Sequence, residues 1–251
     1  MLEAFLGAAG GIIAAVIGAW AALRARHPRE AELELVDVSA SQGESRLVRR
    51  WEPERNAAET WSHVAVLDVK LRNRGDRTAV LKRLELTVEG AGQFGFSRPE
   101  LLAALPSSAT YDITLSPPRW PHHTPAAKDL SQVIPAGEAD RFEVRLHVHA
   151  PDDLRYLYRL HLDLVYNGDD RRVSAGSIAV AFPHPPAVPR SSGTRRSLEF
   201  REGVCSRIVD ILAPATFMSG ELRSTLGGAQ ATLRQLSTLR DGTRPGTQGS
   251  A

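Results

Sequence analysis

Two pairs of polar side chains on neighbouring predicted strands have residue types that could bind a metal ion. His147 and His149 lie two positions apart, so they share one face of a strand. His161 and Asp163 have the same spacing on the next strand and could be their cross-strand neighbours. Imidazole and carboxylate groups bind zinc, but spacing alone does not make them converge. Arginines flank both pairs and would repel a cation, so we expect a polar sheet face without metal or other cofactor.

The other candidates for chemistry are two loop histidines and one cysteine. His122 and His123 are adjacent, and adjacent side chains in an extended chain point apart, which makes joint ligation awkward. Cys205 is the only cysteine, and Arg201 and Arg207 beside it on a predicted helix could lower its thiol pKa. A nucleophile also needs a placed base, and no histidine lies nearby in the sequence. The sequence has no nucleophile-elbow, phosphate-loop or paired-cysteine signature, so we expect no enzyme.

A basic segment around Trp51 could contact a partner. Four arginines surround this tryptophan, and such a loop suits an acidic protein or a lipid phosphate (Arg46, Arg49, Arg50 and Arg55). Four glutamates interleave with them, which favours a solvated loop of mixed charge (Glu44, Glu52, Glu54 and Glu59). Arg49, Arg50 and Trp51 stay our candidates for a partner loop.

The element that would position all these groups is a membrane anchor at the N-terminus. Residues 4–23 contain no charged side chain, and a helix of this length covers roughly 30 Å, the thickness of a hydrocarbon core. Ala19-Trp20-Ala21 could pass for a signal-peptide cleavage site, but the chain begins Met-Leu-Glu without a basic segment. A buried or interfacial helix would show a polar face, and this segment has none. We therefore expect one transmembrane helix.

The residues on and beside this helix predict its orientation and its self-association. Arg24, Arg26 and Arg29 follow it, whereas only Glu3 is charged before it, so the positive-inside rule places the soluble part in the cytoplasm. Small residues recur on one face of the helix and would allow close helix pairing, although such spacing also arises by chance in a segment rich in Ala and Gly (Gly7, Gly11, Ala14, Gly18 and Ala22).

The part that follows the anchor alternates apolar and polar residues in short runs, which predicts half-buried strands. Asn167-Gly168 indicates a two-residue hairpin, and Asn73-Arg74-Gly75-Asp76 indicates a second one with a bulge. Seven short antiparallel strands predict a two-sheet sandwich (32–39, 63–73, 78–89, 109–115, 140–149, 156–166 and 172–182). The 41–60 connection is expected to be a long polar loop, and the stretch 89–137 is expected to hold only the strand 109–115, between loops rich in Pro and Gly.

Two stretches of this region carry a family resemblance. LDVKLRNRGDRTAVLKRLEL and, later, VIPAGEADRFEVRL resemble the hairpin and the Pro-Gly-Glu strand start of bacterial immunoglobulin-like and fibronectin-III-like domains. The resemblance covers roughly residues 32–183 and rests on turn chemistry, so it implies the superfold and no specific family. In strand orders of this kind, the first strand starts at the end that carries the turns at 73–76 and 167–170. The 41–60 connection and the C-terminal exit are then expected at the opposite end.

The whole chain is expected to divide into an anchor with a basic flank (1–29), an immunoglobulin-like sandwich (30–183), a Pro/Ser-rich linker (184–197), a helical segment (198–240) and a disordered tail (241–251). Two amphipathic helices are predicted in the helical segment, over 198–212 and 221–239. The second has a short heptad seam that we expect to pack on its own domain or on a partner (Leu222, Leu226, Ala229, Leu233 and Leu236).

These features favour a non-enzymatic interaction or scaffold protein on a membrane. Its net charge of only +2 gives no field that would recruit nucleic acid, so its expected partners are the lipid bilayer and a protein or a second copy. The alternative is an extracytoplasmic ligand-binding or sensor domain with the opposite topology. An enzyme whose site is not visible in the sequence ranks third.

Overall fold

A computed structural model describes residues 28–43, 46–52, 55–95, 108–118, 125–150, 154–168, 171–183, 186 and 195–242. The predicted transmembrane helix, with its small-residue stripe, and His122 and His123 lie outside these residues. Neither helix that is described combines the length and the apolar composition needed to cross a bilayer.

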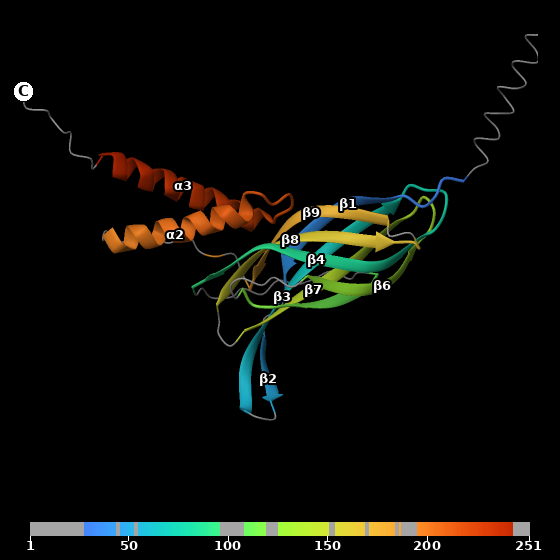
Figure 1. Cartoon of the computed structure of the whole chain (residues 1–251), viewed down its shortest axis with the longest axis horizontal. Helices are drawn as coiled ribbons and strands as arrows, with labels where there is room; N and C mark the ends of the chain where they lie inside the picture. The colour runs from blue at the N-terminus through green and yellow to red at the C-terminus, as the bar shows by residue number, and fades with distance from the viewer. Residues whose placement is uncertain are drawn as a thin grey trace, which may run out of the picture.

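The described chain is mainly β, with two sheets stacked as a sandwich and two helices at one end (Figure 1). Sheet A has the order β1-β3-β7-β5, with β2 paired to a further part of β3 (β1, Leu33–Gln42; β2, Arg46–Glu52; β3, Arg55–Asn73; β5, Thr110–Leu115; β7, Ala139–Ala150). Sheet B has the order β6-β4-β8-β9 (β4, Ala79–Phe94; β6, Ala126–Ile134; β8, Arg155–Tyr166; β9, Arg171–Phe182). The strand pairs are antiparallel except for β5 with β7, which is parallel and corrects the expected all-antiparallel arrangement.

The core between the sheets follows the predicted alternation. Alternate residues of β7 and β8 face inward and are buried, because side chains on a strand point to opposite faces in turn (Phe142, Val144, Leu146 and Val148; Tyr156, Tyr158, Leu160, Leu162 and Leu164). The seven predicted strands are confirmed, although β3 begins eight residues earlier and β4 ends five residues later than predicted. Two strands were missed: β2 in the connection 41–60, and β6 in the connection 89–137.

The two turns have different roles in the structure. At Asn167-Gly168 the prediction of a hairpin is confirmed: β8 and β9 are paired, and Asn167 has a left-handed φ of 56°. At 73–76 the prediction of a hairpin is wrong, because β3 belongs to sheet A and β4 to sheet B. Gly75 suits this crossing, since a Cβ there would lie 2.1 Å from the carbonyl oxygen of Glu30.

The C-terminal helices pack on the outer face of sheet B. Helices α2 (Arg195–Leu212) and α3 (Gly220–Gly242) form a hairpin, and α3 buries its seam against α2 at Leu222, Ala229 and Leu236. Their apolar residues also cover outward-facing Phe94, Leu157, Ala179 and Ala181. The helices are therefore attached to the sandwich, and α2 begins three residues earlier than predicted.

We call the end of the sandwich where β1 begins the proximal end. It comprises residues 28–33 and the turns at 73–78, 135–138 and 167–168. The Arg29 N–H donates to Oδ2 of Asp76 at 2.8 Å, and the Asp76 N–H donates to the Arg29 carbonyl oxygen at 3.1 Å. Arg171 contacts Glu30 and donates to the carbonyl oxygen of Ala31 at 3.1 Å. The expected position of the turns at 73–76 and 167–168 at the start of β1 is confirmed, and the turn at 135–138, which was not expected there, lies with them. The β2–β3 hairpin and both helices leave the sandwich elsewhere (Figure 1).

Candidate functional site

A polar cluster on the outer face of sheet B surrounds His161. Its Nδ1 lies 3.5 Å from Oε1 of Glu89, and its Nε2 lies 3.0 Å from the Ser174 hydroxyl and 3.4 Å from Oδ1 of Asp163. The register of β4, β8 and β9 produces this cluster by placing outward residues of three strands side by side. Glu89 also accepts a hydrogen bond from the Ser177 hydroxyl.

Ser174, His161 and Glu89 follow the order serine, imidazole, carboxylate that serine hydrolases use for acyl transfer. The Ser174 hydroxyl oxygen accepts the Gly176 N–H at 3.2 Å and lies 3.0 Å from Nε2 of His161. Acyl transfer also needs donors for the oxyanion. The neighbouring N–H groups of Thr216 and Phe217 already donate to the Ser177 carbonyl oxygen, at 2.7 and 3.0 Å. These two N–H groups are therefore already engaged and do not serve as oxyanion donors.

The same cluster fastens α2 to the sheet. Arg159, held by Glu89 at 3.1 Å, donates to the carbonyl oxygens of Asp210 and Ile211 at 2.8 and 3.3 Å. These carbonyls belong to the last turn of α2, where a cation is favoured because the helix dipole is negative there. We conclude that the cluster around His161 joins the helices to the sandwich.

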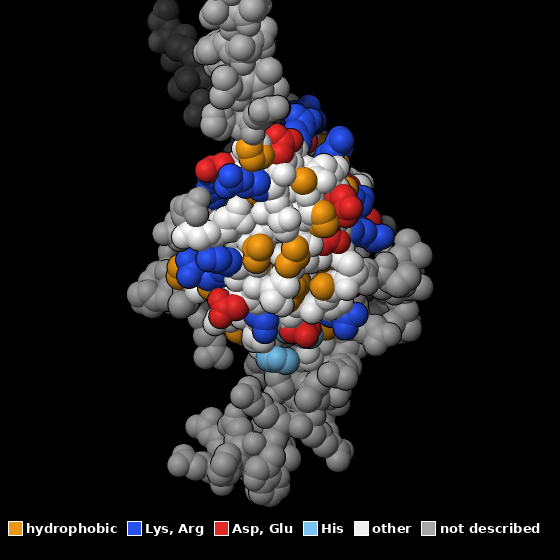
Figure 2. All heavy atoms as spheres, turned by 90° about the vertical axis from the view of Figure 1, so that its right-hand side faces the viewer, with side chains coloured by type: hydrophobic (Ala, Val, Ile, Leu, Met, Phe, Trp, Pro, Cys, Tyr) orange, Lys and Arg blue, Asp and Glu red, His pale blue; other side chains and the backbone are white. Residues whose placement is uncertain are grey.

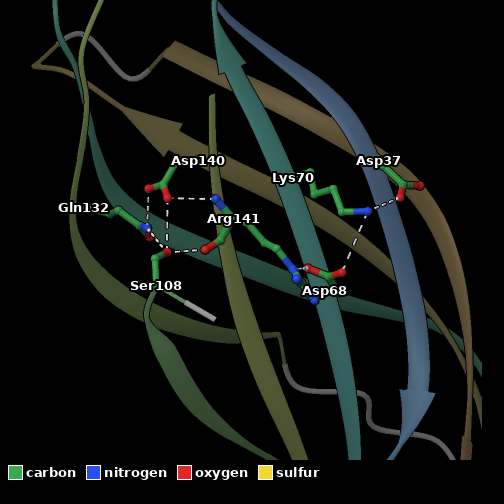
Figure 3. A network of polar contacts seen from close by, with 7 residues as sticks. All are labelled: Asp37, Asp68, Lys70, Ser108, Gln132, Asp140 and Arg141. Atoms are coloured by element: carbon green, nitrogen blue, oxygen red, sulfur yellow. Dashed lines mark hydrogen bonds and ion pairs between the residues drawn. The ribbon is translucent and has the colours of Figure 1, made fainter. Parts of the chain in front are cut away.

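Charged residues on the outer face of sheet A pair with one another (Figure 3). Nζ of Lys70 lies 2.9 Å from Asp37 and 3.9 Å from Asp68, and Nε of Arg141 lies 2.7 Å from Asp68. The hydrogen bond and charge of Asp68 raise the pKa of Arg141. These ion pairs cross three adjacent strands, β1, β3 and β7, and leave little uncompensated charge among their members.

The network in Figure 3 continues to the other sheet through side chains near the proximal end. Gln132 of β6 donates to Asp140 of β7, and also to the Ser108 hydroxyl at 3.2 Å. The Ser108 hydroxyl in turn lies 3.1 Å from Oδ1 of Asp140. These contacts close one side of the sandwich, because β6 and β7 belong to different sheets.

The four weak metal candidates do not come together. His147 and His149 stack on sheet A with ring centroids 6.3 Å apart, and Nε2 of His147 lies 2.8 Å from Asp112. His161 and Asp163 lie on sheet B. The expected cross-strand neighbourhood is wrong because β7 and β8 follow each other in the chain but belong to opposite sheets. Among the residues that the structure describes, no group of three His, Cys, Asp or Glu side chains is arranged so that it could hold a metal ion.

Cys205 is buried between α2 and α3. Burial raises the pKa of its thiol, against the smaller opposing effects of Arg201 and a hydrogen bond with Thr232. The sequence suggested that the neighbouring arginines could lower this pKa, and burial outweighs them. Because the thiolate is the reactive form, the residue is suited to packing rather than nucleophilic chemistry.

The candidate partner loop is part of a β-hairpin. Arg49, Arg50 and Trp51 belong to β2, which pairs with β3 from Arg46↔Ser62 to Glu52↔Arg55. Their side chains lie outside the described part of the structure. Figure 1 shows this hairpin projecting beyond the sandwich, where a partner could reach it.

The proximal end carries a pair that sequence reasoning missed. Val80 and Val133 are cross-strand neighbours on β4 and β6, and both are exposed, by 37% and 56%. Because β6 was expected to be loop, nothing in the sequence indicated that these valines meet.

Comparison with protein-family models and with curated proteins gives no match. Among solved structures, the crystal structure of an ApaA protein from Bordetella pertussis is 11% identical, covers 63% of this chain and 98% of its own, and has a TM-score of 0.29. The X-ray structure of another Northeast Structural Genomics Consortium target is 8% identical, with coverages of 63% and 94% and a TM-score of 0.30. Similarities this low carry no argument about family or function.

Proposed function

We propose that the protein is a single-pass membrane protein that presents its β-sandwich to a protein partner as a non-enzymatic scaffold. The observation that carries the proposal is the short distance along the chain between residues 4–23, which contain no charge, and a segment locked into the sandwich. From Leu23 to Pro28 the chain spans at most roughly 18 Å, even fully extended.

The lock on the proximal segment involves main-chain bonds, so this segment is held as part of the sandwich. The Arg74 N–H donates to the Glu32 carbonyl oxygen at 2.8 Å, in addition to the two bonds between Arg29 and Asp76. A sandwich held in this way keeps its proximal end toward the bilayer. The projecting β2–β3 hairpin is then available to a partner, with Arg49, Arg50 and Trp51 as the proposed contact residues.

The charged outer faces support scaffolding over catalysis. On sheet A the ion pairs satisfy one another, and on sheet B the cluster around His161 holds α2. Groups used in this way are not presented to a substrate. Arg24, Arg26 and Arg29 support a cytoplasmic position for the sandwich under the positive-inside rule.

An immunoglobulin-like superfold is part of the proposal. With β1, β3 and β7 in one sheet and β4, β8 and β9 in the other, the order matches the A, B, E and C, F, G strands of such domains. β6 takes the place beside β4 that an additional strand occupies in variable-type domains. The parallel pairing of β5 departs from the pattern.

We expect Gly11→Leu to weaken self-association of the full chain in a membrane without preventing insertion. Leucine on the small-residue stripe would hold two helices apart while adding hydrophobicity. Crosslinking in vesicles measures the effect, with Ile12→Leu as the control because it lies off the stripe. Equal crosslinking of all three chains would contradict a homo-oligomer formed through this helix.

One observation favours the extracytoplasmic ligand-binding alternative. An open groove of about 680 Å³ lies between β1 and β9, lined by apolar Leu33, Val173 and Phe217 and by polar Glu32 and Arg74. A groove of this size is large enough for a small ligand or a short peptide.

A reporter fused after Ala251 distinguishes the two proposals and tests the anchor. We expect a green fluorescent protein fusion to fluoresce at the cell membrane and an alkaline phosphatase fusion to be inactive. Active phosphatase would favour the ligand-binding alternative. Diffuse fluorescence throughout the cytoplasm would contradict membrane anchoring.

A further inference from the structure

The valine pair at the proximal end leaves part of its apolar surface exposed, 37% at Val80 and 56% at Val133. Val80 is the second residue of β4 and Val133 the next-to-last residue of β6, so both lie close to the ends of their strands. Exposed Pro135 and Ala136 follow in the adjoining turn. Together these four residues are named the valine patch. Figure 2, which faces this end, shows hydrophobic side chains gathered among Lys, Arg, Asp and Glu side chains.

The valine patch is fixed to the segment that leads to the proposed anchor. The Val80 N–H donates to Oδ1 of Asn167 at 2.9 Å, and the Asn167 N–H donates to the Val80 carbonyl oxygen at 2.8 Å. The side chain of Asn73 donates to the carbonyl oxygens of Ile134 and Pro135 at 3.1 and 3.2 Å, and its Oδ1 accepts the Glu32 N–H at 3.3 Å. A force that draws residue 28 toward a bilayer therefore brings the patch with it.

We propose that the valine patch rests in the headgroup region of the bilayer and sets the tilt of the sandwich. The inference rests on the proposed anchor, because lipid reaches this end only if residues 4–23 span the membrane. Exposed Arg77 and Lys82 lie three and two positions from Val80. Such cations suit a membrane interface, where their stems cover apolar surface and their charges meet lipid phosphates.

Lipid fits the patch better than a protein partner does. Four small apolar side chains cover far less than the roughly 800 Å² per partner that a stable protein interface buries. A bilayer requires no shape complementarity, and the short chain between Leu23 and Pro28 keeps it within reach. The anchor also holds lipid at a high effective concentration, so weak contact suffices.

The test uses the full chain with Cys205→Ala and one new cysteine carrying an environment-sensitive fluorophore, at position 133 or at position 93. Gln93 is the control because it is exposed and lies near the opposite end of β4. Both chains are placed in phosphatidylcholine–phosphatidylglycerol vesicles that contain lipid spin-labelled near the top of its acyl chain. We expect several-fold stronger quenching at position 133 than at position 93.

Two substitutions on the chain labelled at position 133 show whether the patch itself makes the contact. Val80→Ser should reduce the quenching, whereas Val36→Ser, at another exposed valine (57%), should leave it unchanged. Flotation of the same vesicles reports on the anchor. Chains that float but are quenched equally at both positions overturn the lipid contact and leave the anchor intact. Chains that do not float overturn both. Protection of position 133 from an aqueous quencher without quenching by lipid would assign the patch to a protein and contradict the inference.

Discussion

Asn73→Ala is expected to lower the free energy of unfolding by about 3 kcal/mol, because each buried group left without its partner costs about 1–3 kcal/mol. Asn73 is fully buried at the proximal end. Its Oδ1 accepts the Gly75 N–H at 3.0 Å, and its Nδ2 donates to the carbonyl oxygens of Arg77 at 2.8 Å and Ile134 at 3.1 Å. One amide thus joins the start of β1, the β3–β4 crossing and the β6–β7 turn.

Urea unfolding of the detergent-solubilised chain, followed by circular dichroism, measures this loss. Gln93→Ala removes an amide of similar chemistry from an exposed position and should change the stability by no more than about 0.5 kcal/mol. Equal stability of Asn73→Ala and Gln93→Ala would show that the proximal end is not held as described.

Deletion of residues 1–23 is expected to transfer the protein from the membrane to the soluble fraction as a folded, β-rich monomer. The first residue of the described core is Ala31, so the deletion removes no side chain of that core. It does remove the proposed spanning helix and its small-residue stripe. Circular dichroism and size-exclusion chromatography check both parts of the expectation. A chiefly helical or unfolded chain would show that the sandwich depends on the missing segment.

Local sequence patterns predicted the strands whose two faces differ. β7 and β8 alternate apolar and polar residues, and the burial of Phe142, Val144 and Leu160 follows that alternation. Asn167-Gly168 predicted its hairpin because the local turn chemistry and the pairing of β8 with β9 agree. The helices were predicted from their apolar faces, and packing on the protein's own domain was one of two alternatives for the second helix, but the contact with sheet B was not specified. Leu157, Ala179 and Ala181, which are apolar on the outward face, were the available signal for that contact.

Strands without alternation, and pairings between distant segments, could not be predicted in this way. β6 has three consecutive exposed residues, Ala127 to Asp129, and lies at the edge of its sheet, so its sequence resembles a loop. β2 pairs only with an extension of β3 and contains three arginines. The turn at 73–76 has the residues of a hairpin, but it crosses between the sheets, and Asn73 is buried at the crossing.

The same limit applies to the candidate site. The two-residue spacing correctly predicted that His147 and His149 share one strand and that His161 and Asp163 share another. It did not indicate that the two strands belong to opposite sheets. Arg159 binding the last turn of α2 joins residues about fifty positions apart, and no local pattern predicts that contact.

Alkaline carbonate extraction of membranes from cells that produce the full chain tests the central proposal most directly. A helix over residues 4–23 that spans the bilayer keeps the protein in the pellet after extraction, and only detergent releases it. A peripherally bound protein is released by carbonate alone. We predict that the full chain stays in the pellet, while the chain lacking residues 1–23 never associates with it. Recovery of the full chain in the carbonate supernatant would contradict the anchor, and with it the orientation of the sandwich and the lipid contact of the valine patch.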